Sequence, residues 1–145
     1  MQAKSILETV IYADDPEACA AFYRRVFGLA ELRAVAGRFN FLRCGGQMLL
    51  IFAPGPCSDP AQQAGIPTHG ARGAGHLCFG VDTRAELDAW REELAAMGVE
   101  IERDLEWPDG GRSLYLRDPA GNSVEIAEKR IWPGLDASGT GHGDG

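Results

Sequence analysis

The feature that most constrains the fold of this chain is an internal repeat. A strand pattern, a helix start, an apolar helix stripe and a glycine stop recur in the same order in both halves of the 145 residues. Four pairs of positions correspond at one constant offset: Glu8 with His76, Asp14 with Asp82, Phe22 with Trp90, and Val26 with Leu94. Chance rarely preserves a strand, a cap and a helix stripe together, so the pattern indicates a duplicated supersecondary unit.

The first half is expected to fold as a βαβββ module. Residues 5–13 alternate as a strand, with Glu8 the one charge on its face. Asp15 and Pro16 then start a helix that stops at Gly28. Three more strands are predicted, over residues 29–35, 38–44 and 47–52.

The second half repeats this order. We expect a strand over residues 75–81, and a helix that is capped by Asp82 or Thr83 and ends at Gly98. The remaining strands are predicted at 99–105, 112–117 and 122–128. Residues 53–74, rich in Pro, Gly, Ser and Gln, predict a linker between modules 1–52 and 75–132, and residues 133–145 predict a disordered tail.

Composition narrows the classes of partner. The net charge of −7 and the lack of a Lys/Arg-rich run argue against nucleic acid and anionic membranes. No apolar run is long enough to span a membrane and the N-terminus does not read as a signal peptide, so we expect a cytoplasmic protein. The four cysteines have no CxxC spacing, which predicts free thiols. A small-molecule partner fits best.

The segment from Asp118 to Asn122 is a tight turn that leads into a strand with Glu125 on its polar face. A lone strand glutamate is more often a solvated carboxylate, and a lone strand histidine such as His76 is more often a satisfied core residue. The repeat favours a ligand role for these residues over a surface or core role. It relates Glu125 to two further candidate ligands, Glu8 and His76, which lie at equivalent points of the first strand of each module.

The chain resembles the vicinal oxygen chelate superfamily, which includes glyoxalase I, fosfomycin-resistance thiol transferases, methylmalonyl-CoA epimerase, extradiol dioxygenases and metal-free bleomycin-binding proteins. The two modules, the sequence FYRRVFGL at residues 22–29, and the turn at 118–122 before Glu125 carry the resemblance, over about residues 6–132. It implies an α+β fold in which two βαβββ modules form a cupped eight-stranded mixed sheet, with the helices packed outside. It also implies one divalent metal ion and a homodimer.

Carried over residue by residue, the resemblance implies that Glu8, His76 and Glu125 bind the metal, whereas the fourth ligand position holds Leu50. Two carboxylates and an imidazole suit Fe²⁺, Mn²⁺, Ni²⁺, Zn²⁺ or Mg²⁺ and do not select among them. Three protein ligands leave coordination positions open, as in catalytic sites.

Strand parity adds further candidates, each with a packing or surface role as the alternative. Tyr115 is the candidate proton or hydrogen-bond donor, and His69, near the mouth of the predicted cup, is a candidate to touch the ligand. Cys78 shares a face with His76. Candidate substrate contacts are Phe39, Phe41, Arg43, Leu50, Ser113 and Arg117.

Several reactions stay open. Leu50 removes the carboxylate that glyoxalase I uses, which disfavours that activity, while Phe39, Phe41 and Tyr115 offer a wall suited to a flat substrate. Our preferred prediction is extradiol-dioxygenase-like cleavage of a small catechol, although Glu8 departs from the two-histidine, one-carboxylate ligand set. The alternatives are a Lewis-acid lyase, epimerase or thiol transferase of the glyoxalase and fosfomycin-resistance type, and a metal-free binding protein of the bleomycin-resistance type.

Overall fold

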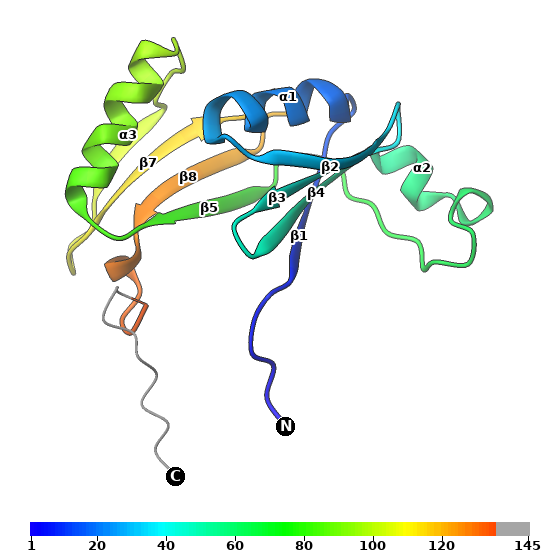
Figure 1. Ribbon diagram of the computed structural model, residues 1–145, viewed down its shortest axis with the longest axis horizontal. Coiled ribbons are helices and arrows are strands. Elements are labelled where there is room, and N and C mark those ends of the chain that lie inside the picture. Colours follow the sequence, from blue (N-terminus) through cyan, green and yellow to red (C-terminus); the bar gives the residue numbers. More distant parts are fainter. Residues whose placement is uncertain (136–145) are drawn as a thin grey trace. The chain divides into compact units, whose positions relative to one another are not determined.

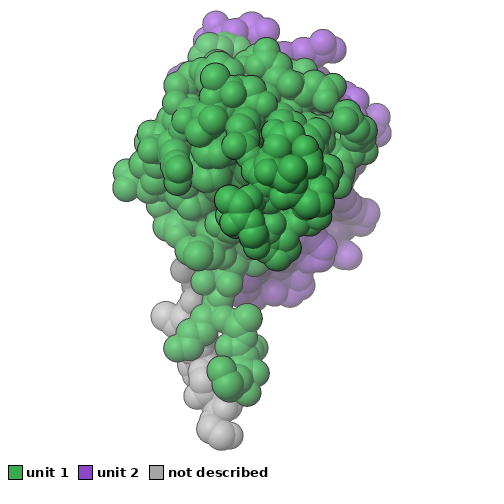
Figure 2. Space-filling model, turned by 90° about the vertical axis from the view of Figure 1, so that its right-hand side faces the viewer, with its two compact units in different colours: residues 1–75, 118–122 green, residues 76–117, 123–145 purple. Residues whose placement is uncertain are grey.

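The computed structural model describes residues 1–135. It divides into two compact units, coloured separately in Figure 2. Unit 1 comprises residues 1–75 together with the turn at 118–122, and unit 2 comprises residues 76–117 and the chain from residue 123 onward. The turn at 118–122, which joins two strands of the second module, therefore belongs to the first unit.

Unit 1 contains the predicted βαβββ module. Its elements are β1 (Glu8–Tyr12), α1 (Pro16–Phe27), β2 (Ala30–Val35), β3 (Phe39–Cys44) and β4 (Gln47–Phe52) (Figure 1). The strands form one mixed sheet in the order β1-β4-β3-β2, with β1 parallel to β4 and the other pairs antiparallel. The apolar stripe of α1 covers one sheet face, and its fully buried members include Cys19, Ala20 and Tyr23.

The local signals for α1 are confirmed. Asp15 accepts a hydrogen bond from the Ala18 amide at 3.0 Å, Pro16 lies in the first turn, and Gly28 takes the left-handed conformation (φ 65°) that favours glycine after a helix. β1 is shorter than the predicted strand, because only Glu8–Tyr12 pair with β4.

Residues 53–74, predicted as a linker, carry secondary structure of their own and belong to unit 1. A short helix α2 (Pro54–Ser58) and a 3₁₀ turn η1 (Pro60–Gln62) follow β4 directly. Each starts at a proline, whose fixed φ suits a first helical position, and the Asp59 side chain caps the second through the Ala61 amide. The composition predicted a linker between the modules, and the structure adds that this segment contains a short helix and a 3₁₀ turn.

Unit 2 repeats the topology. Its elements are β5 (His76–Val81), α3 (Arg84–Ala96), β6 (Arg103–Glu106), β7 (Arg112–Arg117), β8 (Ser123–Glu128) and a 3₁₀ turn η2 (Lys129–Ile131). The strand order is β5-β8-β7-β6, again with the first pair parallel. The α+β class and the paired βαβββ modules are thus confirmed, as two four-stranded mixed sheets.

Some predicted boundaries of unit 2 differ. β6 begins at Arg103 instead of residue 99. The capping box of α3 is confirmed in part: Thr83 Oγ1 accepts from the Glu86 amide at 3.2 Å, but the Glu86 carboxylate accepts from Asp82 N. All four cysteines are free, as predicted. Most of the predicted tail, residues 136–145, lies outside the described residues, and Leu135 closes a turn onto the carbonyl of Trp132. Within residues 1–135, no helix is long and apolar enough to cross a membrane.

Candidate functional site

One face of the unit 2 sheet carries the polar candidates. Cross-strand pairs join Glu125 on β8 to Cys78 on β5 and to Tyr115 on β7, so these three side chains share a face. His76, two residues before Cys78, points the same way. The residues between them in sequence, including Leu114, Leu116, Val124 and Ile126, are fully buried on the opposite face, the one that α3 covers. The predicted strand parity is therefore confirmed.

His76 and Glu125 converge. The Nε2 atom of His76 lies 3.3 Å from Oε2 of Glu125. On the other side of the ring, Nδ1 lies 3.1 Å from the carbonyl oxygen of Ser123. Because a carbonyl only accepts, Nδ1 carries the hydrogen, and Nε2 is the atom that offers a lone pair when the imidazole is neutral. The backbone of β8 thus selects the tautomer and the orientation of His76.

Glu125 is a buried carboxylate, only 6% exposed. The Tyr115 hydroxyl donates to its Oε1 at 3.0 Å. Burial, followed by the hydrogen bond to Glu125 and its negative charge, raises the pKa of Tyr115 to about 12, so the phenol keeps its proton at neutral pH. Burial and the charge of Glu125 likewise raise the pKa of Cys78 to about 12. The Tyr115 hydroxyl and the Cys78 thiol are neutral, so they do not balance the negative charge of the buried Glu125 carboxylate. A cation bound to this carboxylate would balance it.

The other polar candidates of unit 2 are already engaged. Arg117 donates to Glu102 through Nε at 2.7 Å and through Nη2 at 3.1 Å. Its guanidinium therefore already pairs with a carboxylate of the protein, which disfavours the predicted role of binding an anionic group of the substrate. The buried Ser113 accepts from the indole nitrogen of Trp107 at 2.8 Å. A cavity of about 470 Å³ opens beside them, lined by Glu102, Arg103, Tyr115, Arg117 and Ser123. Our sequence analysis missed Arg103, although its alternation within the predicted strand could have placed it opposite Tyr115.

The equivalent face of unit 1 is aromatic. Leu50 pairs with Val10, two residues after Glu8, just as Glu125 pairs with Cys78, two residues after His76. The register therefore confirms that Leu50 is the counterpart of Glu125. Leu50 is 8% exposed and offers no ligand atom.

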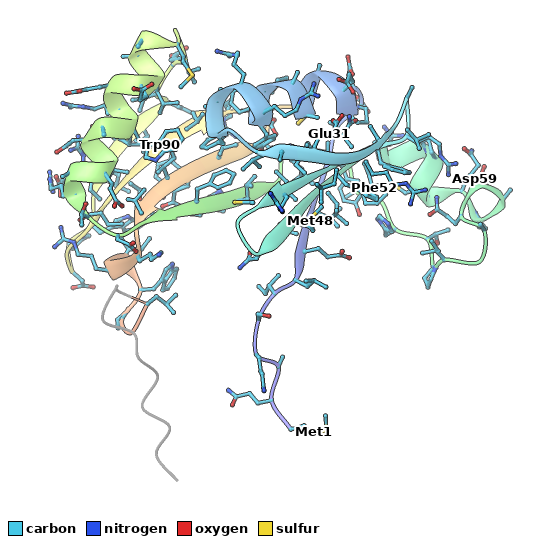
Figure 3. The ribbon with its side chains drawn as sticks, viewed as in Figure 1. Met1, Glu31, Met48, Phe52, Asp59 and Trp90 are labelled. Atoms are coloured by element: carbon cyan, nitrogen blue, oxygen red, sulfur yellow. The ribbon has the colours of Figure 1, made fainter. Side chains whose placement is uncertain are left out.

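Two rings of the predicted aromatic wall, Phe39 and Phe41, lie together in unit 1, whereas the third, Tyr115, belongs to unit 2. The rings of Phe39 and Phe41 stack with centroids 4.2 Å apart, and Phe52, labelled in Figure 3, packs edge-on against Phe41 at 5.3 Å. Arg43 is exposed and pairs with Met48, which places it on the same face, at the end nearer Glu8.

The structure brings His69 to this aromatic face. Its Nδ1 lies 2.7 Å from the Tyr12 hydroxyl, and its ring meets Phe52 edge-on with centroids 4.8 Å apart. The backbone amide of His69 donates to the Cys57 carbonyl at 3.1 Å. Sequence analysis missed Tyr12, because no local signal links it to a residue 57 positions away.

The full predicted ligand set is not brought together within either unit. His76 and Glu125 belong to unit 2, and Glu8, which is exposed on β1, belongs to unit 1. Among residues 1–135, no cluster of three or more His, Cys, Asp or Glu side chains that could hold a metal ion is formed. The participation of Glu8 stays a prediction.

Comparison with known proteins identifies the family. Residues 5–126 match the model of the glyoxalase/bleomycin resistance protein/dioxygenase superfamily. The chain belongs to this superfamily. No curated protein matches it significantly.

Solved structures of the superfamily align over most of the chain. A structure described as lactoylglutathione lyase from Agrobacterium tumefaciens is 45% identical, covers 92% of this chain and 99% of its own, and has a TM-score of 0.88. A glyoxalase-related enzyme from Fulvimarina pelagi is 26% identical, with 90% and 92% coverage and a TM-score of 0.65. A superfamily protein from Nocardioides, 20% identical with 88% and 85% coverage and a TM-score of 0.70, shares the fold.

Proposed function

We propose that this chain is a divalent-metal-dependent enzyme of the Lewis-acid lyase or isomerase type. Its substrate is a small molecule with two adjacent oxygen atoms. The observation that carries the proposal is the pair of His76 and Glu125, a preoriented imidazole nitrogen beside a buried carboxylate. A protein that only sequestered a ligand would have no need for this arrangement.

The donor atoms fit a divalent ion. Two ligand atoms that each lie ~2.1 Å from one ion, at tetrahedral or octahedral angles, are separated by roughly 3.0–3.4 Å. The 3.3 Å between Nε2 and Oε2 falls in this range. The hydrogen bond from Nδ1 to a backbone carbonyl is the support that metal-binding histidines usually receive. Glu8 would complete the predicted set.

Such an ion, when bound, polarises a carbonyl or hydroxyl oxygen of the substrate and stabilises developing negative charge there. The protein residues have separate tasks. Tyr115 holds Glu125 in place through its hydroxyl, and because its phenol stays protonated it is a neutral donor in contact with the pair. Arg103, at the rim of the adjoining cavity, suits an anionic substituent of the substrate.

The lyase or isomerase class comes first because of the 45% identical relative. That protein is described as a lactoylglutathione lyase, so the first substrates to test are adducts of thiols with 2-oxoaldehydes. Isomerisation of such an adduct moves one proton between neighbouring carbon atoms and one between their two oxygen atoms, and it needs no oxidant. Extradiol cleavage of a catechol is the second candidate, and the stacked Phe39 and Phe41 rings favour the flat substrate it requires.

The test begins with chelation, followed by reconstitution with Zn²⁺, Ni²⁺, Mn²⁺, Mg²⁺ or, without air, Fe²⁺. We expect one ion per chain by elemental analysis, lost in His76→Ala, and turnover of a thiol–2-oxoaldehyde adduct to the hydroxyacyl thioester. A parallel arm measures oxygen uptake by the Fe²⁺ form with a panel of catechols.

The isomerisation assay and the oxygen-uptake assay distinguish the lyase proposal from the dioxygenase prediction. Oxygen uptake with a catechol, without isomerisation by any metal form, would replace the lyase proposal with the dioxygenase prediction. A chain that binds no divalent ion after reconstitution, or a His76→Ala variant with full metal content, would overturn the metal site. His142→Ala, outside the described residues, is the matched control for histidine replacement.

A further inference from the structure

We propose that unit 1 carries a second binding site, separate from the His76–Glu125 pair, for a small zwitterion such as a free α-amino acid. The site is a cavity of about 400 Å³ beside the end of β1 and the start of α1. All of its lining residues fall within 12–74 and 119–121 and therefore belong to unit 1. This inference goes beyond the proposed function and involves neither the metal ion nor unit 2.

Three segments form the walls of this cavity. One runs from Tyr12 at the end of β1 to Ala18 in α1, the second is the turn at 119–121, and the third is the chain at 71–74. Most of the lining residues are alanine, glycine or proline, so short side chains and backbone make up the walls. Small-molecule sites occupy roughly 300–1,000 Å³, and this cavity lies toward the lower end of that range. A compact ligand therefore fits it better than an extended one.

The wall at 119–121 is held by a network of hydrogen bonds. Oδ1 of Asp118 accepts from the Ala120 and Asn122 amides, both at 2.9 Å. Its Oδ2 accepts from the Tyr23 hydroxyl at 2.8 Å, which ties the turn to α1, the helix whose first turn forms another wall. The shape of the cavity on this side is therefore fixed by the fold of unit 1.

The third wall belongs to a strap, residues 70–74, that is fastened at both ends. Before the strap, the His69 amide donates to the Cys57 carbonyl at 3.1 Å. After it, the Gly75 amide donates to Oδ1 of Asn122 at 2.7 Å. The strap can therefore bend between these two anchors without leaving unit 1.

Side chains of both charges line the cavity. Arg72, midway along the strap, has its Nη1 3.6 Å from Oδ1 of Asp14. The two side chains are 74% and 91% exposed, so this ion pair contributes little to stability and opens readily. Asp15 is already engaged as the cap of α1, because its Oδ1 accepts from the Ala18 amide at 3.0 Å. The cavity therefore offers one cation and one anion that a ligand can exchange.

These charges favour a ligand that carries both signs. A purely anionic ligand would take Arg72 from Asp14 and leave that carboxylate unpaired, and a purely cationic ligand would leave the guanidinium unpaired. A zwitterion replaces one ion pair with two, because its carboxylate pairs with the planar guanidinium and its ammonium group pairs with Asp14. A divalent ion fits less well, since within residues 1–135 no three His, Cys, Asp or Glu side chains cluster for metal binding.

The experiment follows the backbone amide signals of isotope-labelled protein by NMR while L-alanine, L-leucine or L-phenylalanine is added. We expect saturable shifts of the Gly73 and Ala120 signals with at least one of them. Two probes of the same body lack one charge each: for leucine, isoamylamine lacks the carboxylate and isocaproate lacks the ammonium group. Since hydrogen bonds to charged groups contribute most, each probe should bind roughly 10-fold more weakly or less.

Variants assign each charge of the ligand to one side chain. In Arg72→Gln the preference for leucine over isoamylamine should disappear, and in Asp14→Asn the preference for leucine over isocaproate should disappear. Arg25→Gln and Asp109→Asn, which remove exposed charges elsewhere, are the matched controls and should bind like the wild type. Trypsin cleavage after Arg72 should slow at saturating ligand, because the bound carboxylate holds the strap, while cleavage at other sites stays unchanged.

Several results would overturn the proposal. These are no binding of any of the three amino acids, equal binding of a probe with one charge, and unchanged preferences in Arg72→Gln or Asp14→Asn. Unaltered cleavage after Arg72 at saturating ligand would also contradict it. Binding that is lost after chelation or in His76→Ala would place the ligand at the metal pair instead. A chain that binds the amino acid but no metal would defeat only the proposed function.

Discussion

Replacing Tyr23 with phenylalanine should measure how strongly the β7–β8 turn is held to unit 1. Tyr23 on α1 is fully buried, and its hydroxyl donates to Oδ2 of Asp118 at 2.8 Å. Asp118 is itself 5% exposed. The two residues lie 95 positions apart in sequence, so the contact joins two distant segments of unit 1.

The expected loss of stability depends on which hydrogen-bond donors Asp118 keeps in the Tyr23→Phe variant. A hydrogen bond to a charged group contributes ~1.5–3 kcal/mol net. In Tyr23→Phe, Oδ2 keeps the Asn122 side-chain amide at 2.9 Å and the Cys19 thiol at 3.4 Å, and the ring keeps its contact with Phe22. We therefore expect a loss of about 2 kcal/mol in the free energy of unfolding. For a chain of this size, the melting temperature should drop by about 4–8 °C.

The assay is chemical denaturation combined with a double-mutant cycle. In the wild type, Oδ1 of Asp118 accepts from the Ala120 and Asn122 backbone amides, while Oδ2 accepts from the side chains. Asp118→Asn keeps only one acceptor oxygen, so one of these two groups of donors loses its partner. We expect this variant to be less stable than Tyr23→Phe, and the pair to show a coupling energy of ~1 kcal/mol or more. Equal stability of Tyr23→Phe and the wild type, or a coupling energy of zero, would refute the reasoning.

The pH dependence provides an independent check of the same contact. Burial, followed by the charge of Asp118, raises the pKa of Tyr23 well above its ordinary value of 10.0. The native chain therefore keeps this proton at alkaline pH while the unfolded chain releases it, so the unfolded state binds fewer protons. The stabilisation is complete below about pH 10 and decreases as the pH rises further. Tyr23→Phe should have a flatter alkaline stability profile than the wild type.

The remaining predictions concern the metal pair, the surface and the assembly. Glu125→Gln should lower the affinity for the divalent ion by ~10-fold or more, as measured by competition with a chelating dye. The Arg112 guanidinium holds the pKa of Asp104 below its usual range, so this pair should stabilise the fold above about pH 4 and lose that effect on acidification. Asp104→Asn should remove that part of the acid dependence, worth ~1 kcal/mol at most since Asp104 is partly exposed. Thr83→Ala should cost ~1 kcal/mol in thermal unfolding through the lost cap. Light scattering at micromolar concentration should give the mass of a homodimer, and a monomer would contradict that prediction.

Periodicity and capping residues predicted the modules because their signals are local. Asp15 before Pro16, and Thr83 before Glu86, mark helix starts through contacts within one turn. Alternation along each strand placed Cys78 on the face of His76 and Ser123 on the face of Glu125, since side chains point to opposite faces with a period of two, and the family resemblance placed His76 and Glu125 together. The repeat then related Leu50 to Glu125, and the strand register agrees.

Contacts between distant residues could not be predicted in this way. The hydrogen bond from Tyr23 to Asp118 and the one between Tyr12 and His69 join segments whose spacing carries no period. The sequence marked residues 118–122 as a turn, but two partners of the Asp118 carboxylate, Tyr23 and Cys19, come from α1. The helix α2 was missed for another reason: prolines start a short helix as readily as they end a long one.

The two units share a register and differ in what their equivalent faces carry. Where unit 2 has Glu125, unit 1 has Leu50, and where unit 2 has His76, unit 1 has Glu8. A duplicated backbone fixes where side chains emerge but not what they are, so each copy is free to specialise. Unit 2 has kept polar donors that converge on one buried carboxylate, whereas unit 1 has gathered phenylalanines and one histidine held by Tyr12.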